Sequence, residues 1–397
     1  MSKLRILMVS DVHFPRVNGV STSIDTFRQC LPDCGVDVKL VVPRYGDEAD
    51  SPGVIRVPGR PVPRDPEDRI VRWKAMHQAV REAARDCDLI HIQTPFIAHY
   101  AGTKAARALG LPVLCTYHTL FEEYLHHYAP FLPGGWLKAL ARQISRSQCN
   151  ALDGVIVPSS AMRERLEAYG VTTPLHVLPT GIPLSRFASG DRMRFRGAHG
   201  IPPEQPVALF VGRVAFEKNI DFLLAALARA RARRPDLLLL VTGNGPALPA
   251  LQQETRRLGL EKQVRFLGYL DRQTELQDCY AAADVFVFAS RTETQGLVLL
   301  EAMAMGLPVV ALAEMGTKDI LGPGRGCVVP TADPQDFAAA LTTLIDDPER
   351  LRRLGVEARE YAASWSDTAM AAGLAHLYQQ LITDTVPWKV PTKAKPA

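Results

Sequence analysis

RTETQGLVLLEAMAMG, residues 291–306, is the stretch around which this chain is organised. It follows residues 285–288 (VFVF), a short apolar run that is typical of a buried parallel strand. Its own segment from Val298 to Met305 has a helix-forming composition that ends at Gly306. The stretch therefore predicts a strand, a turn and a helix, the unit from which parallel α/β sheets are built.

Two carboxylates, Glu293 and Glu301, lie eight residues apart in this stretch, and we expect the first in the turn and the second on the helix. A fully helical interval would separate them by about 12 Å at about 1.5 Å per residue, which suits an extended ligand. Gly296 lets a backbone come close, and free N–H groups at the helix start favour a phosphate. A solvated turn glutamate and a helix-surface glutamate would give the same spacing.

Length and composition indicate a globular protein of several domains. The 397 residues exceed one ordinary core and predict two or three domains. Hydrophobic residues make up 47% and charged residues 22%, as in typical globular chains. The net charge of +4 does not favour nucleic acid as a partner.

The seven cysteines show no Cys-x-x-Cys pairing, which argues against a zinc site and a disulfide framework and favours a reducing cytosol. The chain enters a strand-like segment from residue 4 without a signal-peptide pattern, and no apolar run approaches the length of a spanning helix. We therefore expect a cytoplasmic protein, which is compatible with attachment to a membrane surface.

Apolar runs alternate with helical patterns along the chain, at spacings typical of βαβ units. In the first half the runs are residues 6–9, 36–42, 54–57, 89–92, 113–117, 155–157 and 175–178. In the second half they are residues 207–211, 237–241, 264–267, 285–288, 309–311 and 327–329. This pattern predicts an α/β protein with two doubly wound, Rossmann-like domains whose parallel sheets are covered on both faces.

The domain boundary is expected where the alternation lapses into Gly, Pro and Arg, over residues 180–206, which we interpret as the connection. The predicted domains are residues 1–182 and 183–365. Helical patterns at 334–345 and 348–363 close the second domain, and a last helix within residues 366–385 is expected to pack back onto the first. The tail, 386–397, has the composition of a disordered segment.

Ligands of open α/β sheets collect beyond the carboxyl ends of the strands, so the turns after the strands are the candidate sites. Asn18-Gly19 precedes the first helix, where it is either a simple turn or an anion site at a helix N-terminus. His118 follows the strand at 113–117 and is either a ligand or a histidine satisfied by a neighbouring carbonyl.

The turn after residues 207–211 holds Arg213 and Lys218, five residues apart beside a helix start. Such a pair can clamp a diphosphate, because Arg grips two oxygens while Lys adds a mobile charge. The alternative is a surface pair between Lys218 and Glu217 or Asp221.

Gly243-Asn244-Gly245 is half of a dinucleotide fingerprint, but Leu248 stands where the third glycine belongs and Pro246 interrupts the loop. The pattern argues against nicotinamide binding and leaves the approach of a nucleoside to this backbone open. Asp86-Cys87-Asp88 resembles a metal-holding Asp-x-Asp but precedes its strand, at the wrong end of the sheet. We therefore predict no metal site.

Taken together, these motifs resemble the signature of the family 4 retaining glycosyltransferases of GT-B fold. The matching segments are Asn18-Gly19-Val20, His118, Gly212-Arg213, Glu217-Lys218-Asn219 and Glu293 to Glu301. They cover nearly the whole chain in the family's order. The resemblance implies a nucleotide-diphosphate sugar as donor, bound mostly by the C-terminal domain, with no tightly bound cofactor and no metal required.

The resemblance also implies a role for each candidate residue. Arg213 and Lys218 would neutralise the diphosphate leaving group, and Glu293 and His118 would bond the transferred sugar. Donor binding would further involve Glu301 on the ribose, Gly19 on the phosphate, and the backbone around Thr294, Gln295, Gly296 and Leu297, with Gly243 beside the nucleoside. No protein nucleophile is implied: the configuration is retained and the leaving phosphate takes the acceptor proton, unlike in retaining glycosidases.

Residues 15–24 and 118–128 resemble the corresponding segments of bacterial diacylglycerol glucosyltransferases, which implies an acceptor-binding N-terminal domain. Downstream, Lys138, Arg142 and Arg146 recur every four residues on one helical face, and the apolar residues Leu137, Leu140, Ala141 and Ile144 lie to its side. Such a segment suits docking on anionic lipid, although an ordinary core helix with a solvated basic face has the same spacing.

The resulting hypothesis is a hexosyltransferase that moves glucose from UDP-glucose to a membrane lipid hydroxyl such as that of diacylglycerol, at the inner face of the cytoplasmic membrane. One alternative is a GDP-mannose-dependent mannosyltransferase acting on a glycan or polyprenyl-linked acceptor. Another is a non-catalytic nucleotide-sugar-binding protein on the same fold. The sequence indicates no oligomeric state.

Overall fold

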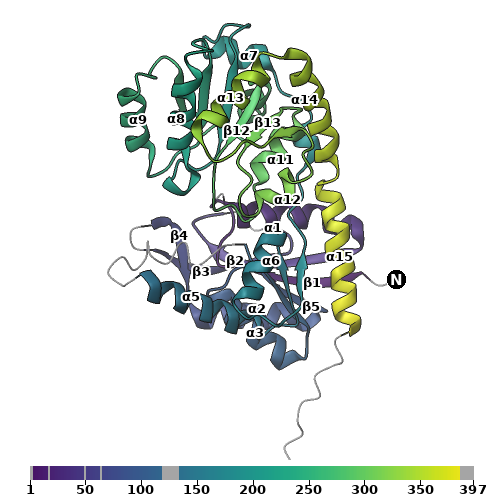
Figure 1. Ribbon diagram of the computed structural model, residues 1–397. Helices are drawn as coiled ribbons and strands as arrows, with labels where there is room; N and C mark the ends of the chain where they lie inside the picture. Colours follow the sequence, from purple (N-terminus) through teal and green to yellow (C-terminus); the bar gives the residue numbers. More distant parts are fainter. Residues whose placement is uncertain (1–2, 17, 49–50, 63–64, 119–133, 385–397) are drawn as a thin grey trace, which may run out of the picture. The chain divides into compact units, whose positions relative to one another are not determined.

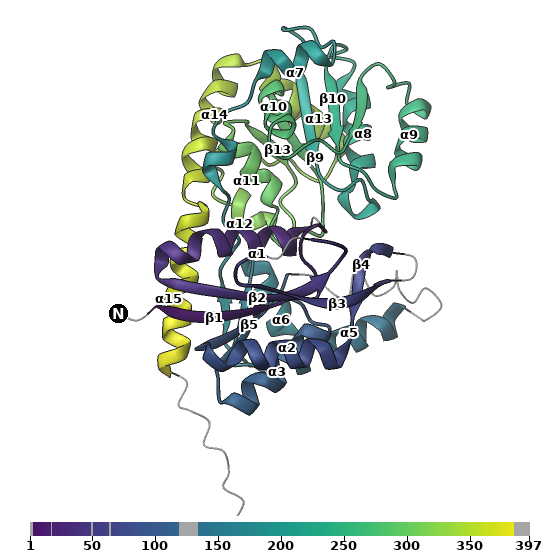
Figure 2. The same cartoon turned by 180° about the vertical axis from the view of Figure 1, so that it is seen from behind.

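The computed structural model describes residues 3–384 except 17, 49–50, 63–64 and 119–133, and it leaves the side chains of 65–68 and 134–138 undescribed. The tail expected to be disordered, 386–397, lies outside this part. The chain divides into two compact units, Met1–Gly181 with Asp367–Ala397, and Ile182–Ser366. Each is an α/β unit with its own sheet (Figures 1 and 2).

The first unit holds an eight-stranded sheet in the order β4-β3-β2-β1-β5-β6-β7-β8. Its strands are β1 (Leu4–Val9), β2 (Val36–Arg44), β3 (Val54–Val62), β4 (Asp65–Val71), β5 (Leu89–Ile92), β6 (Val113–Thr116), β7 (Gly154–Val157) and β8 (Leu175–Val177). The central strands are buried on both faces, as the near-continuous apolar runs predict.

The expectation of a wholly parallel sheet is wrong at one edge, where β4 pairs antiparallel with β3. The sequence of β4, DPEDRIV, carries a proline and four charges. An edge strand tolerates these residues because one side of it needs no ladder partner, so the strand lacks the apolar signature on which the prediction relied.

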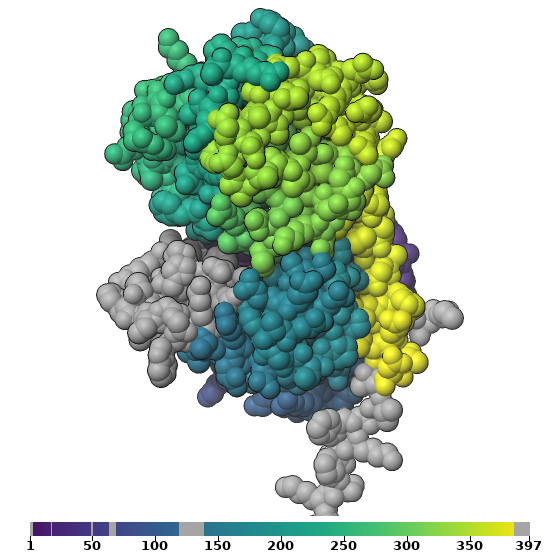
Figure 3. Space-filling model, viewed as in Figure 1, coloured from purple at the N-terminus to yellow at the C-terminus, as the bar shows by residue number. Residues whose placement is uncertain are grey.

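The helices of the first unit are α1 (Gly19–Cys30), α2 (Trp73–Ala83), α3 (Ile97–Leu109), α5 (Gly134–Cys149), α6 (Ser160–Ala168) and α15 (Asp367–Asp384), with short 3-10 turns η1 (Leu31–Cys34) and η2 (Ala84–Asp86). Helix α15 packs Leu374 and Tyr378 into the same core as Ile24 of α1. Figure 3 shows α15 in yellow along this unit, where Leu381 lies against Gly154 of β7.

The second unit holds a six-stranded parallel sheet in the order β11-β10-β9-β12-β13-β14. Its strands are β9 (Val207–Val211), β10 (Leu238–Thr242), β11 (Val264–Gly268), β12 (Val285–Phe288), β13 (Val309–Ala311) and β14 (Cys327–Val328). The order reverses between β9 and β12, so the loops after these two neighbouring strands meet at the carboxyl edge, where such sheets bind ligands.

The helices of the second unit are α7 (Arg192–Ala198), α8 (Ile220–Ala230), α9 (Leu248–Arg257), α10 (Glu275–Ala282), α11 (Leu297–Ala304), α12 (Thr317–Leu321), α13 (Pro334–Ile345) and α14 (Pro348–Ala363), with η3 (Leu184–Phe187) and η4 (Phe216–Lys218). Helices α13 and α14 have the predicted bounds. Each begins with a proline after an aspartate cap, Asp333 or Asp347, which is a strong sequence signal for a helix start.

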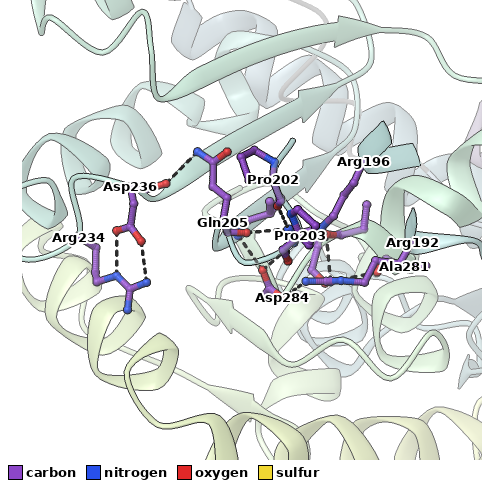
Figure 4. A network of polar contacts seen from close by, with 12 residues as sticks. Arg192, Arg196, Pro202, Pro203, Gln205, Arg234, Asp236, Ala281 and Asp284 are labelled. Carbon is purple, nitrogen blue, oxygen red and sulfur yellow. Dashed lines mark hydrogen bonds and ion pairs between the residues drawn. The ribbon is translucent and has the colours of Figure 1, made fainter. Parts of the chain in front are cut away.

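The interpretation of residues 180–206 as a plain connection is wrong, because α7 within it is anchored in the second unit by the buried Arg196 (Figure 4). The Arg196 guanidinium donates to the carbonyl oxygens of Ala282 at 2.9 Å and Pro202 at 2.7 Å, and to Asp284 Oδ2 at 3.1 Å. Asp284 also accepts from the Arg192 guanidinium at 2.7 Å.

This network offsets the cost of burying a side chain that is only 1% exposed. Burial lowers the pKa of Arg196 from its usual value. The charges lie at the amino ends of β9 and β12, where Asp284 also accepts from the Val207 backbone N–H at 2.8 Å. The network therefore fixes the sheet from the edge opposite to the candidate site.

Candidate functional site

Lys218 and Glu293, which the sequence places 75 residues apart, form an ion pair at the carboxyl edge of the second unit. Lys218 Nζ lies 2.5 Å from Glu293 Oε1, and the two side chains are 18% and 17% exposed. Lys218 lies after β9 and Glu293 after β12, so the adjacency of these strands brings the two predicted residues together. The ion pair crosses between loops, unlike the local surface pair considered as the alternative.

Asn219 fixes the loop that carries Lys218. Its backbone has the left-handed φ of +56°, which asparagine tolerates better than most residues. Its side-chain amide donates to the carbonyl oxygen of Ala289, just beyond β12, at 3.1 Å. This hydrogen bond joins the loop of Lys218 to the segment that leads from β12 to Glu293, in addition to the ion pair between the two side chains.

Glu301 lies on α11 and is only 5% exposed, so the alternative of a helix-surface glutamate is wrong. Its Oε1 accepts from the Arg272 guanidinium at 3.0 Å, and its Oε2 accepts from the Tyr280 hydroxyl at 2.9 Å. These bonds offset the cost of burying a carboxylate. Burial, and then the neighbouring Glu301, raise the pKa of the Tyr280 hydroxyl well above its usual value.

Arg272 and Tyr280 were not singled out from the sequence. They lie 29 and 21 residues before Glu301, in a loop and on α10, and no local spacing links them to it. An arginine and a buried tyrosine become a signal only when the fold brings both side chains to Glu301.

The two glutamates are separated by a turn as well as a helix. Helix α11 begins at Leu297, after Gly296 with a φ of +98°. Glu293 therefore lies in the turn and Glu301 on the helix, as expected, and the separation of about 12 Å for a fully helical interval does not apply. The Glu293 carbonyl oxygen accepts from the Gly316 N–H at 2.8 Å, which holds the turn. Gln295 is buried and Thr294 is half-buried within it.

Arg213 is brought to the same edge, but its side chain is exposed and makes no hydrogen bond or ion pair to another described residue. It follows β9 directly, whereas Lys218 lies further along the same loop. The structure therefore pairs only one of the two predicted cations with a carboxylate.

Gly243 and Gly245 allow the loops after β9 and β10 to meet. A Cβ on Gly243 would lie 1.9 Å from the Gly212 carbonyl oxygen, and one on Gly245 would lie 2.3 Å from that of Val214. The Val214 N–H donates to the Asn244 carbonyl oxygen at 3.0 Å across this contact. The contact accounts for the half fingerprint without a dinucleotide, while nucleoside binding by Gly243 stays a prediction.

In the first unit, Asn18 is the N-cap of α1, and its side-chain oxygen accepts from the Ser21 N–H at 2.9 Å. Gly19 follows at the first helical position. A Cβ placed there would meet no atom of the structure within 4 Å. Internal packing of the described residues thus gives no reason for a glycine at this position.

His118 follows β6, and its Nε2 lies 2.9 Å from Oε1 of Gln93, which follows β5. The Gln93 side-chain carbonyl oxygen is a neighbouring carbonyl of the kind that the alternative interpretation of His118 expects, whereas a ligand role for His118 stays a prediction. Burial lowers the pKa of His118 to about 4, which makes the imidazole neutral at neutral pH.

Asp11, after β1, is a buried carboxylate that the sequence reasoning did not single out. It accepts from the Thr94 hydroxyl at 2.8 Å and from the Ala98 N–H, near the start of α3, at 3.1 Å. Burial raises its pKa to about 6, although these hydrogen bonds lower it. Asp11, Gln93 and His118 thus follow three neighbouring strands, at one edge of the sheet.

The acidic residues set aside as a metal motif have other partners. Asp86 accepts from the Lys39 ammonium at 2.7 Å, and Asp88 accepts from the Arg5 N–H at 2.8 Å. Within the described ranges, no group of three or more His, Cys, Asp or Glu is placed to hold a metal ion.

Over the residues whose side chains are described, helix α5 buries small or polar side chains and exposes large apolar ones, the reverse of an ordinary amphipathic helix. It buries the small or polar Ala141, Ser145 and Gln148, while Leu140 is 54% and Ile144 41% exposed. Arg142 lies over the Tyr169 ring, 5.6 Å from its centroid, and Lys138 lies outside the described side chains. Of the apolar residues expected beside the basic face, Leu140 and Ile144 therefore face outward and Ala141 faces inward, while Leu137 lies outside the described side chains. No described helix is long and apolar enough to cross a bilayer.

Two family models match the chain in succession: Glycosyltransferase Family 4 over residues 17–186, and Glycosyl transferases group 1 over residues 191–361. An alpha-monoglucosyldiacylglycerol synthase of Streptococcus pneumoniae is 34% identical, with 78% of this chain and 71% of that protein aligned. A GDP-mannose-dependent alpha-mannosyltransferase of Mycobacterium tuberculosis is 30% identical, with 84% and 85% aligned.

Solved structures have the same fold. Sucrose-phosphate synthase of Thermosynechococcus elongatus superposes with a TM-score of 0.77 at 23% identity, covering 96% of this chain and all of that one. Anabaena HepE, solved in complex with UDP-glucose, superposes with a TM-score of 0.74 at 20% identity, covering 95% of this chain and 100% of that one.

Proposed function

The chain belongs to the family 4 glycosyltransferases of GT-B fold, and from this premise we propose that it transfers glucose from UDP-glucose to a membrane lipid hydroxyl, such as that of diacylglycerol. As a member of this family it is a nucleotide-sugar-dependent glycosyltransferase with two Rossmann-like domains. The sugar, the base and the acceptor are the proposed part.

The observation that carries the transfer chemistry is the Lys218–Glu293 pair at the carboxyl edge of the second unit, while the relatives' names support the sugar and the acceptor. Lys218 offers an ammonium and Arg213 an exposed guanidinium after the same strand, two cations suited to a developing diphosphate. Glu293 keeps one oxygen, Oε2, outside the ion pair and would bond a sugar hydroxyl with it. Glu301 would bond the ribose from α11.

The remaining assignments follow from position. The turn at Thr294, Gln295, Gly296 and Leu297 would present backbone amides to the sugar and diphosphate at the start of α11. Gly243 would lie beside the nucleoside. In the first unit, Gly19 would admit a phosphate at the start of α1, and the neutral His118 would bond the transferred sugar.

We propose retention of the anomeric configuration without a covalent enzyme intermediate. The oxygen of Glu293 that contacts Lys218 is engaged in a charge-assisted bond, which lowers its nucleophilicity. The leaving diphosphate, stabilised by Lys218 and Arg213, would take the proton of the acceptor hydroxyl. Neither step requires a metal.

A lipid acceptor is supported by the names of relatives and by one surface of the first unit. That surface, the α3–α5 patch, comprises the exposed Phe96, Tyr100, Leu140 and Ile144. Gln148 of α5 joins the two helices, because its amide donates to the Pro95 carbonyl oxygen at 2.8 Å and to the Tyr100 hydroxyl at 3.2 Å. Exposed apolar side chains on a basic helix suit an anionic bilayer surface, and we propose peripheral attachment at the inner face of the cytoplasmic membrane.

Donor turnover tests the site assignment. Lys218→Ala should reduce transfer from UDP-glucose by at least about 100-fold, the scale of losing a charged contact to the transition state. Glu301→Ala, which removes the ribose contact, should reduce it by about tenfold or more. Lys262→Ala is the matched control, because Lys262 is an exposed lysine of the same unit. Transfer near the parent rate in either site variant would show that the assignment is wrong.

Vesicle sedimentation tests the membrane surface. Leu140→Ser with Ile144→Ser should weaken binding to vesicles containing anionic phosphatidylglycerol and leave the melting temperature unchanged, because both side chains are exposed. Val356→Ser, at a 51% exposed valine of the second unit, is the control. Undiminished vesicle binding by the double variant would remove the α3–α5 patch from the proposal.

The mannosyltransferase relative favours a second candidate, GDP-mannose as donor with a glycan or polyprenyl-linked acceptor. Thermal-shift titration with UDP and GDP separates the two, since a ligand that binds the native state raises the melting temperature. A larger shift with GDP would favour the mannosyltransferase. A shift with either nucleotide, together with no transfer, would favour the non-catalytic nucleotide-sugar-binding protein of this fold.

A further inference from the structure

Glu301 is held by two donors that the chain supplies from outside α11, and we infer that Tyr280 and Arg272 are positioning residues that fix its carboxylate to receive the vicinal hydroxyls of a ribose. The inference rests on the proposed function, which assigns Glu301 to the ribose. It adds that ribose recognition depends on Tyr280 and Arg272 as well as on the carboxylate itself.

Each oxygen of the Glu301 carboxylate accepts a hydrogen bond from a different donor. Tyr280 donates to Oε2 at 2.9 Å and Arg272 donates to Oε1 at 3.0 Å. A carboxylate offers about four lone-pair positions, so each oxygen retains capacity for one more donor. Because one bond is made on each side, rotation of the carboxylate about its last torsion would break both.

Tyr280 is the rigid member of this pair. It is 1% exposed, and its ring packs edge-on to Phe187 and tilted against Phe286, with centroids 6.0 Å away in each case. These contacts hold the ring in place, with its hydroxyl against Glu301 Oε2. Since burial and the adjacent carboxylate raise the pKa of Tyr280, the hydroxyl stays protonated and donates.

Arg272 is the accessible member, with a side chain 40% exposed beside a Glu301 side chain that is 6% exposed. Its loop is closed by Asp271, which accepts from the Thr274 N–H at 2.8 Å, and by Gln277, whose amide donates to the Arg272 carbonyl oxygen at 2.8 Å. The backbone beneath the guanidinium is thus held, and Glu301 can be approached from the side of Arg272.

Recognition of a vicinal diol requires a carboxylate that is held in one orientation. Two hydroxyls of a ribose donate to a carboxylate most favourably when both oxygens are presented in one fixed plane, and a freely rotating carboxylate would lose part of that gain to side-chain entropy. Removing the Tyr280 hydroxyl should consequently weaken the ribose contact while it leaves the diphosphate contact of Lys218 intact.

The test measures how strongly the protein prefers UDP to 2′,3′-dideoxy-UDP, and GDP to 2′,3′-dideoxy-GDP, by calorimetric titration. The parent should prefer the ribonucleotide by about tenfold or more, the scale of hydrogen bonds to a charged group. Tyr280→Phe and Arg272→Met should each shrink this ratio by at least about threefold, mainly by weakening the ribonucleotide. Arg272→Lys, which keeps a cationic donor, should restore part of it.

Tyr378→Phe is the matched control. Tyr378 is a fully buried tyrosine of the other unit, and its hydroxyl pairs with His91 Nδ1 at 2.7 Å. The variant should lower stability as Tyr280→Phe does, without changing the ratio. A merely structural Tyr280 would weaken ribonucleotide and dideoxynucleotide alike, and that result would overturn the inference.

The Glu301→Gln variant shows whether a negative result concerns only the roles of Tyr280 and Arg272 or also the assignment of Glu301 to the ribose. If it leaves the parent ratio unchanged, or if the parent binds none of the four nucleotides, the assignment of Glu301 to the ribose is wrong and the inference falls with it. If Glu301→Gln abolishes the preference while Tyr280→Phe and Arg272→Met retain it in full, only the inference is wrong.

Discussion

Gly243 and Gly19 both lie at candidate ligand loops, but they should respond in opposite ways to the same added methyl group. In Gly243→Ala the Cβ would lie 1.9 Å from the Gly212 carbonyl oxygen, well inside the 3.0 Å that real Cβ contacts keep. Its φ of +117° is also unfavourable for alanine. Backbone strain of about 1–2 kcal/mol and overpacking of about 1–3 kcal/mol predict a total loss of about 2–5 kcal/mol.

Gly19→Ala meets no described atom within 4 Å and needs no unusual φ. Alanine is favoured over glycine in a helix by up to about 1 kcal/mol, so this variant should be as stable as the parent or slightly more so. If a phosphate approaches the start of α1, the same methyl group occupies its path. The KM for UDP-glucose should then rise by about tenfold or more.

Melting curves and donor kinetics on both variants test this pair of expectations. At roughly 2–4 °C per kcal/mol for a unit of this size, Gly243→Ala should melt about 5–20 °C below the parent, and Gly19→Ala should melt within 2 °C of it or above. A Gly243→Ala variant that melts with the parent would refute the packing argument. A Gly19→Ala variant with parent kinetics would refute the phosphate path.

Three further expectations concern charged and buried groups. Arg196→Met should cost about 3–5 kcal/mol in denaturant unfolding, because several carbonyl oxygens lose their buried donor, although Asp284 keeps Arg192 as a partner. Lys3→Met at the exposed pair with Asp37 should cost almost nothing, and equal losses would contradict this. The first unit should lose stability as the pH falls from 6.5 toward 4, since burial lowers the pKa of His91 to about 3 and of His13, His99 and His118 to about 4, and the unfolded chain then binds protons that the folded one cannot. Asp11, whose pKa is raised to about 6, has the opposite effect, because between pH 3.8 and 6 the folded chain holds a proton that the unfolded chain releases, and stability falls as the pH rises. A stability maximum below pH 5 would mean that Asp11 outweighs the histidines. Glu293→Gln should lower kcat/KM for the donor and leave the product anomer unchanged by NMR; an inverted anomer would contradict the absence of a nucleophilic role.

Local sequence signals predicted much of this fold. The helical patterns at 334–345 and 348–363 predicted the bounds of α13 and α14, and the buried parallel strands were visible as apolar runs. The edge strand β4 was not, because its proline and charges are tolerated only at an edge that the sequence does not identify. Buried Arg196 was hidden for a similar reason, since its partners are mostly backbone carbonyls.

The candidate site was predictable where its residues lie in the turn that follows a strand. Lys218 and Glu293 each occupy such a turn, and the strand order that joins them is a property of the sheet. Arg272 and Tyr280 reach Glu301 from other elements, so no spacing in the sequence points to them. Gly243 belongs to a motif that the sequence does show, but the close approach of Gly212, which also requires a glycine at this position, is visible only in the structure.

The central claim, transfer of a hexose from a nucleotide sugar to a lipid, is tested most directly by the products. The protein is incubated with UDP-glucose, GDP-mannose and other nucleotide sugars, each in the presence of total lipid extract, and both phases are analysed by mass. We expect a hexosylated diacylglycerol in the organic phase with UDP-glucose, absent with Lys218→Ala. A product found only in the aqueous phase would contradict the lipid acceptor, and no product with any donor would contradict the proposed transfer.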